Sequence, residues 1–378
     1  NNETTIIETN DPFVELKKLL GKSNDQKYRY LGGAVGVVNY DSIRLVENIS
    51  EENNLSQPIM EFGIYDDGLL YDNVEKKLFY FYHDVNRFDE LIVSDDSFDE
   101  FNSSEVIPNM DKEKFSSIVN KAKQYIHDGD IFQVVLSRKF AFDTSGDNLT
   151  LYKTLRKLNP SPYMYHLKQD SKTIIGASPE MLVRITDDKV ETFPIAGTRK
   201  ITDNEEKNKA LSEELIHDEK ELAEHTMLVD LGRNDIGRVC KYGTVHPESL
   251  MQIKRFSHVQ HIVSHVVGNL DSKNDMFDAF QAVFPAGTVS GAPKVRAMQI
   301  IDELEGEKRG PYAGAVGYFS YNGCCDFAIA IRSIFIENNK GFVQSGAGIV
   351  SDSVAENEFK ETEHKAGAML QALKEASK

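Results

Sequence analysis

The sequence predicts an α+β fold, because strand-like segments occur in groups and long helical segments follow them without a regular βαβ alternation. The clearest strand signal is the segment 312–336, which alternates around a Tyr-Asn-Gly turn and therefore predicts an antiparallel hairpin. The chain has 378 residues, of which 40% are hydrophobic and 27% charged, and this composition is typical of a folded protein with a sizeable core. One large domain and two ordinary ones are both compatible with this length.

The N-terminal portion, residues 1–108, is rich in predicted strands. Three segments combine Tyr, Phe, Val and Leu with Gly, Asp and Asn turns: 28–40, 68–73 and 77–84. The acidic, polar stretch 95–109 suits a surface connection, and we place a boundary near Pro108. We expect residues 1–108, in a structural or regulatory role, to form one continuous compact unit with a catalytic portion, residues 109–378.

The catalytic portion begins with a predicted helix. Apolar residues recur at helical spacing from the candidate N-cap Asp111 to about Gly129. A hairpin turn is predicted at Asp187-Asp188. The remaining expected elements are strands at 132–142, 173–185 and 189–198 and helices at 205–230, 276–284 and 294–304.

The charge balance bears on possible partners. Sixty acidic residues against 43 basic ones give a formal net charge of -17, which opposes a phosphate backbone and argues against nucleic-acid binding. An anionic substrate would need a metal ion or placed Arg and Lys side chains to offset this charge locally.

The cysteine count and the apolar segments bear on the compartment. The three cysteines, Cys240, Cys324 and Cys325, have neither metal-ligand spacing nor a disulfide framework, which favours a reducing compartment. No run of about eighteen apolar residues occurs, and the first residues lack a signal-peptide pattern. We therefore expect a cytoplasmic protein that does not contact a membrane. Because the chain begins with Asn1 rather than Met, we also expect a trimmed N-terminus.

Two Glu-x-x-Glu segments are candidates for a metal site. Glu221 and Glu224 are three residues apart, as are Glu358 and Glu361, and Lys365 follows four residues later. On a helix each pair shares a face, and Mg²⁺ takes one or two carboxylates with water and substrate oxygens. On spacing alone, solvated helix faces are the more common explanation. The flanking HTMLVDLGRND and QSGAGIV segments are unlike a surface and favour a buried site.

Other segments leave alternatives open. The glycine-rich segments 284–294 and 344–350 lack the spacing of phosphate-binding loops, so we exclude nucleotide binding and leave ordinary turns as the alternative to ligand loops. On a helix, His261 and His265 would have the spacing of a zinc pair, but the HExxH pattern is absent, and a structural or substrate-facing His261 is favoured. Arg332, at the end of the apolar strand FAIAIR, either recognises a carboxylate or is an ordinary strand-end arginine.

Several long strings in this sequence resemble the chorismate-utilising enzymes, and most closely the anthranilate synthase component I branch of that family. The strings run from about Asp111 to Ala366 and include PIAGTR, ELAEHTMLVDLGRNDIGRV, FPAGTVSGAPKVRAM, DFAIAIRS and SGAGIVSDSVAENEFKETEHKA. The resemblance implies a sandwich of large antiparallel β-sheets with helices packed outside, and chorismate bound beside Mg²⁺.

The resemblance also implies roles for individual residues. Glu224 and Glu361 would be the principal Mg²⁺ ligands, with Glu221 and Glu358 nearby, directly or through water. Lys365 would lie at the carboxylate end of chorismate. The other implied chorismate contacts are Gly197, Thr198, Tyr318, Arg332, Gly346, Ala347 and Gly348.

The implied reaction is the amination of chorismate by ammonia at C2, with loss of the C4 hydroxyl, followed by release of pyruvate and aromatisation to anthranilate. Hydroxide is a poor leaving group and needs a general acid, and Glu180 matches the family position for it. His261 matches the position linked to pyruvate release.

Two uncharged residues favour the ammonia branch of the family. Related enzymes that deliver water place a Lys base where this chain has Gln133, and an amide cannot deprotonate water at neutral pH. Aminodeoxychorismate synthases typically carry a Lys nucleophile where this chain has Ala196. The remaining alternatives are an aminodeoxychorismate or aminodeoxyisochorismate synthase and a non-catalytic chorismate-binding homologue.

Ammonia implies a partner, because the chain shows no glutaminase signature. The resemblance implies a glutamine amidotransferase subunit, anthranilate synthase component II. It also implies a tryptophan site joining an N-terminal LLES-type segment to a Pro-Tyr-Met turn. Pro162, Tyr163 and Met164 match the turn, but the N-terminal segment is not found.

Overall fold

The protein forms two large β-sheets, as seen in a computed structural model that describes residues 4–45, 47, 49, 58–91, 99–256 and 259–378. Every pairing between neighbouring strands is antiparallel. In order across the nine-stranded sheet, the strands are β12 (Ile195–Lys200), β14 (Val259–Asn269), β11 (Lys189–Thr192), β10 (Met181–Thr186), β17 (Cys325–Ile329), β16 (Ala315–Ser320), β1 (Gly33–Val38) and β2 (Met60–Tyr65), with β13 (His246–Arg255) paired to β14.

The second sheet has eight strands and is centred on two long ones. Its order is β15 (Gly291–Ala292), β7 (Gln133–Gly146), β19 (Lys340–Ile349), β18 (Ser333–Glu337), β9 (Lys172–Ser178) and β8 (Tyr163–Gln169), with β5 (Phe101–Ser103) and β6 (Ile107–Pro108) paired to β7. A separate hairpin consists of β3 (Asp67–Asp72) and β4 (Lys77–Tyr82).

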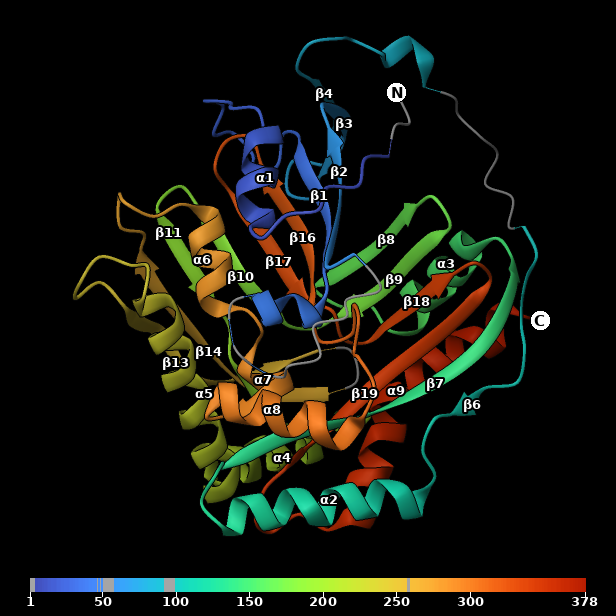
Figure 1. Cartoon of the computed structure of the whole chain (residues 1–378), viewed down its shortest axis with the longest axis vertical. Coiled ribbons are helices and arrows are strands. Elements are labelled where there is room, and N and C mark those ends of the chain that lie inside the picture. The colour runs from blue at the N-terminus through green and yellow to red at the C-terminus, as the bar shows by residue number, and fades with distance from the viewer. Residues whose placement is uncertain (1–3, 46, 48, 50–57, 92–98, 257–258) are drawn as a thin grey trace.

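Helices surround the two sheets, and Figure 1 shows α2 and α9 beside the β7–β19 pair and α5 beside the β13–β14 pair. The helices are α1 (Pro12–Leu19), α2 (Lys112–His127), α3 (Asn148–Leu158), α4 (Glu205–His217), α5 (Glu219–Gly237), α6 (Met276–Val283), α7 (Gly287–Ser290), α8 (Lys294–Glu305) and α9 (Ala355–Ala376).

The core consists of three clusters of buried apolar side chains. Between the sheets, apolar side chains of β1, β16, β17 and α6 meet Ile174 and Phe335 of the second sheet. On the outer face of the second sheet, one cluster packs against α3 and α9, and another packs against α2 and α8. The predicted α+β sandwich with outer helices is therefore confirmed.

Local signals were reliable predictors. The Asp111 side chain accepts a hydrogen bond from the Lys114 amide and caps α2, which ends at His127. The β10–β11 hairpin turns at Asp187-Asp188, as Thr186 pairs with Lys189. The Tyr-Asn-Gly signal lies between β16 and β17, where Gly323 adopts a positive φ of 84°.

Four expectations need correction. His261 and His265 lie on strand β14, not on a helix, because the segment pairs with strands on both sides. The stretch 95–109 is not only a surface connection: Phe101 is buried in β5, whereas residues 95–98 lie outside the described residues. Arg332 does not end the strand that precedes it, because β17 ends at Ile329. Tyr163 and Met164 do not form a turn, because they are the first two residues of β8.

The division at Pro108 stays a prediction. The structure shows that strands from both portions share one sheet, since β1 pairs with β16 over six residue pairs, from Gly33–Ser320 to Val38–Ala315.

Candidate active site

The first carboxylate pair lies in the opening turns of α5. The Asp218 side chain accepts hydrogen bonds from the amides of the first turn and so fixes where the helix begins. Glu224 Oε1 accepts a hydrogen bond from Gln133 Nε2 at 3.0 Å, and Glu221 Oε1 accepts one from Arg199 Nη1 at 3.1 Å. Burial, and then repulsion from Glu224, raises the pKa of Glu221 against the opposing effect of Arg199.

The second carboxylate pair lies on α9. Lys365 Nζ lies 2.6 Å from Glu361 Oε1 and donates to the Gly346 carbonyl on β19 at 3.0 Å. Burial raises the pKa of Glu358, and Glu361 adds to this rise, whereas the ammonium of Lys220 on α5 opposes it. Lys220 lies in the first turn of α5, so the N-terminal turns of α5 and α9 interact electrostatically.

Glu180 is a buried carboxyl beside these helices. Glu180 comes shortly after the end of β9 in the chain, and the residue is only 8% exposed. Burial raises its pKa to about 7, against smaller lowering effects from Thr288 and Lys365. A small hollow of about 40 Å³ adjoins Glu180 and Thr288. Glu180 therefore titrates near neutral pH, where a substantial fraction of the carboxyl is protonated and can donate a proton.

His261 lies at the other side of the same cluster. Its Nδ1 lies 2.8 Å from the Gly197 carbonyl oxygen and 3.1 Å from Thr198 Oγ1. Burial lowers its pKa, with Arg332 and Lys365 adding to the shift. The ring is thus neutral, and because a carbonyl only accepts, Nδ1 carries the proton and Nε2 is left as a base.

His265 does not join this cluster. Its ring stacks on Phe193 at 4.1 Å and contacts the carboxylates of Glu191 and Glu248 at 2.9 and 2.8 Å. The two histidines therefore have separate partners.

The glycines of β19 allow close contact between side chains of the site. A methyl group on Gly348 would lie 2.8 Å from Gln133 Nε2, and one on Gly346 would lie 2.9 Å from Tyr312 Oη. A Cβ on Gly197 would likewise lie 3.1 Å from Glu221 Oε2. Ala347 differs, because its side chain is packed in the core cluster between the second sheet and α2 and α8, which leaves only its backbone for a ligand.

Arg332 lies in the connection between β17 and β18 with a φ of 52°. Burial lowers its pKa, whereas Tyr312 and Glu361 nearby raise it. The side chain therefore lies within electrostatic range of Tyr312 and Glu361, and its recognition of a carboxylate stays a prediction.

Tyr312 is a site residue that the sequence reasoning missed. Its hydroxyl lies close to Gly346. Burial raises the pKa of Tyr312 to about 12, whereas the positive charge of Arg332 opposes this rise. The signal was its position directly before the Ala-Gly of YAGAVGYF.

The structure does not bring Tyr318 to the cluster. The Tyr318 ring packs against Tyr30 with centroids 4.8 Å apart, and its pKa is raised by burial and by Asp326. Asp326 also accepts hydrogen bonds from Tyr163 Oη and Arg184 Nε, both at 2.8 Å. Tyr318 thus lies in a second polar cluster with Tyr163, whereas Met164 packs against the outer core next to α3 and α9.

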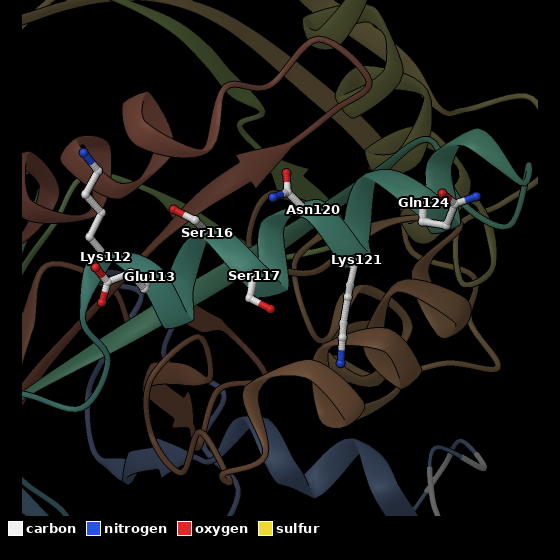
Figure 2. A pocket seen from close by; sticks show the side chains of 7 residues that line it. All are labelled: Lys112, Glu113, Ser116, Ser117, Asn120, Lys121 and Gln124. Atoms are coloured by element: carbon white, nitrogen blue, oxygen red, sulfur yellow. The ribbon is translucent and has the colours of Figure 1, made fainter.

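No metal centre is preformed in the described part of the chain, where no three His, Cys, Asp or Glu side chains converge closely enough. Two other hollows contain none of the predicted residues. One lies along the exposed face of α2, where Figure 2 shows the seven lining side chains spread along a single helix. The other, about 540 Å³, lies between the two sheets, where residues of β1, β18 and β19 line it. Within the same residues, no helix is long and apolar enough to cross a bilayer.

The fold and the site define an α+β enzyme in which a buried carboxyl of raised pKa, Glu180, and a histidine of lowered pKa, His261, both lie within electrostatic range of Lys365, a combination typical of active sites. The profile of the chorismate binding enzymes matches residues 1–371, and the chain belongs to that family.

Individual relatives agree with this assignment. Anthranilate synthase component 1 of Acetivibrio thermocellus is 46% identical, and the alignment covers 99% of this chain and 84% of the relative. The same-named protein of Methanothermobacter marburgensis is 45% identical over 98% of this chain and 80% of the relative. Aminodeoxychorismate synthase component 1 of Bacillus subtilis is 43% identical over 94% of this chain and 80% of the relative.

A solved structure gives the same result for the fold. The crystal structure of anthranilate synthase component I from Streptococcus pneumoniae TIGR4 superimposes with a TM-score of 0.88 at 40% identity, covering 97% of this chain and 86% of the other.

Proposed function

We propose that this chain is the large subunit of an anthranilate synthase, which converts chorismate and ammonia to anthranilate and pyruvate. The observation that carries the proposal is the contact between Gln133 and Glu224, which puts an amide, rather than an amine base, beside the carboxylate pair of α5. The names of the relatives at 45–46% identity support it.

The residues of the chain account for both chemical steps. Glu180 donates its proton to the departing C4 hydroxyl, which leaves as water when ammonia bonds to C2. Because Gln133 cannot remove a proton from water, ammonia is the nucleophile. In the second step His261 Nε2 takes the C2 proton while the C3–O bond breaks, so that the new C2=C3 double bond completes the aromatic ring. The enolpyruvate that leaves takes up a proton and becomes pyruvate.

Arginine and lysine supply the local positive charge that an anionic substrate needs. Arg332 and Lys365 lie beside Glu361 and Gly346, and Tyr312 adds a hydroxyl donor next to them. A carboxylate of chorismate bound here gains charge-assisted hydrogen bonds in a partly buried site.

The donor chemistry fits a magnesium ion. Glu221 and Glu358 each have a pKa raised by burial and by the neighbouring Glu of the pair, a repulsion that a divalent cation relieves. Glu224 and Glu361 would be its principal ligands, with Glu221 and Glu358 directly or through water. When bound, Mg²⁺ supplies charge neutralisation and a fixed point for substrate oxygens.

The partner in this proposal is a glutamine amidotransferase subunit that supplies ammonia. It is supported by the designation "component 1" of the relatives and by the absence of a glutaminase signature in this sequence. A cytoplasmic location agrees with the three free cysteines.

Incubation of the chain with chorismate, Mg²⁺ and ammonium tests the proposal by the fluorescence of anthranilate. Accumulation of a non-aromatic amine without pyruvate would instead identify an aminodeoxychorismate or aminodeoxyisochorismate synthase, and chorismate binding without turnover would identify a non-catalytic homologue. Glu361→Ala should abolish Mg²⁺-dependent turnover and leave the circular dichroism spectrum unchanged. A globally unfolded Glu361→Ala variant would show that the carboxylate has a structural role.

A further inference from the structure

Thr362 follows Glu361 on the buried side of α9, and two residues of the second sheet form hydrogen bonds with it. Arg138 Nη1 donates to Thr362 Oγ1 at 3.1 Å, and the Ser345 hydroxyl donates to the Thr362 carbonyl at 2.6 Å. All three residues are almost fully buried, with exposures of 1% for Arg138, 4% for Ser345 and 0% for Thr362. These bonds join the helix that carries Glu361 to two strands.

Arg138 and Ser345 belong to one rung of the β7–β19 ladder. They are paired directly across the two strands, so their side chains extend from the same face of the sheet. On the next rung Gly346 is paired with Ser137, and its carbonyl accepts the hydrogen bond from Lys365. The helix is therefore attached to two successive rungs of the strand pair that also carries Gln133 and Gly348.

The Arg138 side chain is itself immobilised. Its guanidinium carbon lies 3.8 Å from the ring centroid of Phe359 on α9 and 5.1 Å from that of Phe140. Its Nη2 donates to the Met110 carbonyl at 3.0 Å. A buried guanidinium held by two aromatic rings and a backbone carbonyl has little freedom to move, so it restricts the groups that it contacts.

The rotation of α9 about its axis matters for the proposed metal site. A carboxylate lies about 6 Å from the helix axis, so a rotation of about 20° moves it by about 2 Å. Mg²⁺ requires oxygen distances near 2.0–2.1 Å with little tolerance. A helix that is free to rotate by this amount would lose the cation.

We propose that Arg138 and Ser345, acting through Thr362, are positioning residues that set the rotation of α9 and so aim Glu358 and Glu361 at the cation. This inference rests on the metal site of the proposed function. None of the three residues touches the substrate or the metal, and their effect is on the orientation of the groups that do.

Thr362→Val tests the proposal, because it removes the hydroxyl without changing the shape of the side chain. Mn²⁺ titration monitored by electron paramagnetic resonance, with Mg²⁺ competition, should show affinity weakened by about 10–100-fold, as for other residues that orient metal ligands. Thr362→Ser keeps the hydroxyl and should restore affinity to within about threefold of the original. Ser345→Ala gives the same direction of change and serves if Thr362→Val does not fold.

Thr154→Val is the matched control. The Thr362 hydroxyl donates to the Phe359 carbonyl of its own helix at 2.7 Å, and the Thr154 hydroxyl likewise donates to the Thr150 carbonyl of α3 at 2.9 Å. It should leave Mn²⁺ affinity unchanged. If Thr362→Val and Ser345→Ala lower thermal stability but bind Mn²⁺ as tightly as the unmodified chain, the positioning role is wrong. If the unmodified chain binds no Mn²⁺, the metal site of the proposed function fails as well.

Discussion

At the scale of single residues, burial sets the protonation state of the two groups assigned to acid–base chemistry. Burial raises the pKa of Glu180 and lowers that of His261, so near neutral pH the first is a proton donor and the second a proton acceptor. Their identities were predicted from motif positions, but their protonation states follow from the packing around them.

Glu180→Gln tests the acid through stability as well as activity. The folded chain keeps the Glu180 proton up to about pH 7, whereas the unfolded chain releases it near 4.5, so stability falls as the pH rises through this window, by about 3 kcal/mol. The variant lacks this pH-dependent loss of stability. In urea unfolding, its stability relative to the original should therefore be higher at pH 7.5 than at pH 5. Its kcat should fall by about 10²–10⁴-fold; unchanged turnover would refute the assignment.

His261→Gln tests the second step. Glutamine can still donate to the Gly197 carbonyl but cannot act as a base, so pyruvate release should fall by about 10²-fold or more while chorismate is still consumed. Chromatography of the products should reveal a non-aromatic amine. His265→Gln, on the same strand with separate partners, should behave like the unmodified chain. Normal pyruvate release by His261→Gln would remove His261 from this role.

At the scale of elements, helices α5 and α9 contribute carboxylates, and the β7–β19 pair fixes the distance between them and the other groups. Gln133 on β7 reaches Glu224 on α5, and Gly346 on β19 accepts from Lys365 on α9. Each helix face was predictable from i,i+3 spacing, since it is a local property. Their proximity depends on the strand register, which no spacing within either helix encodes.

Gly348→Ala tests how closely β19 must approach Gln133. The new methyl group would lie 2.8 Å from Gln133 Nε2 and displace it from Glu224. We expect kcat/KM for ammonium to fall by about tenfold, the effect of about 1.4 kcal/mol, in the fluorescence assay for anthranilate. Gly367→Ala on α9, where nothing lies within 4 Å, is the control and should be neutral in kinetics. Equal kinetics for both variants would count against a role for Gln133.

At the scale of the whole molecule, a buried ion pair ties the two sheets and α8 together. Arg309 and Glu305 are 2% and 6% exposed, and their side chains lie 2.7 Å apart. Glu305 also accepts from Ser137 on β7, and the Arg309 guanidinium lies 4.8 Å from the Tyr40 ring beyond β1. Removing one partner leaves the other charge buried and uncompensated.

Glu305→Ala should therefore destabilise the fold by about 3–5 kcal/mol in urea unfolding. Glu303→Ala is the matched control on the same helix, because Glu303 contacts only the exposed Tyr125 hydroxyl among the described interactions and should cost less than about 1 kcal/mol. A Glu305→Ala variant as stable as the control would show that the Arg309–Glu305 ion pair does not stabilise the fold.

Residue patterns along the chain were enough to predict the family, the α+β class, the α2 cap at Asp111, the hairpins and the two carboxylate helices. These follow from local chemistry, namely capping side chains, turn residues and periodicity, or from long motif strings. The folded structure was needed to show that residues 259–269 form a strand, that Tyr312 rather than Tyr318 lies near Gly346 and Arg332, and that Arg138 and Ser345 bind Thr362. These three features depend on which face of a strand packs against which helix. Strand pairing between distant segments fixes that choice, and residue type within one segment does not.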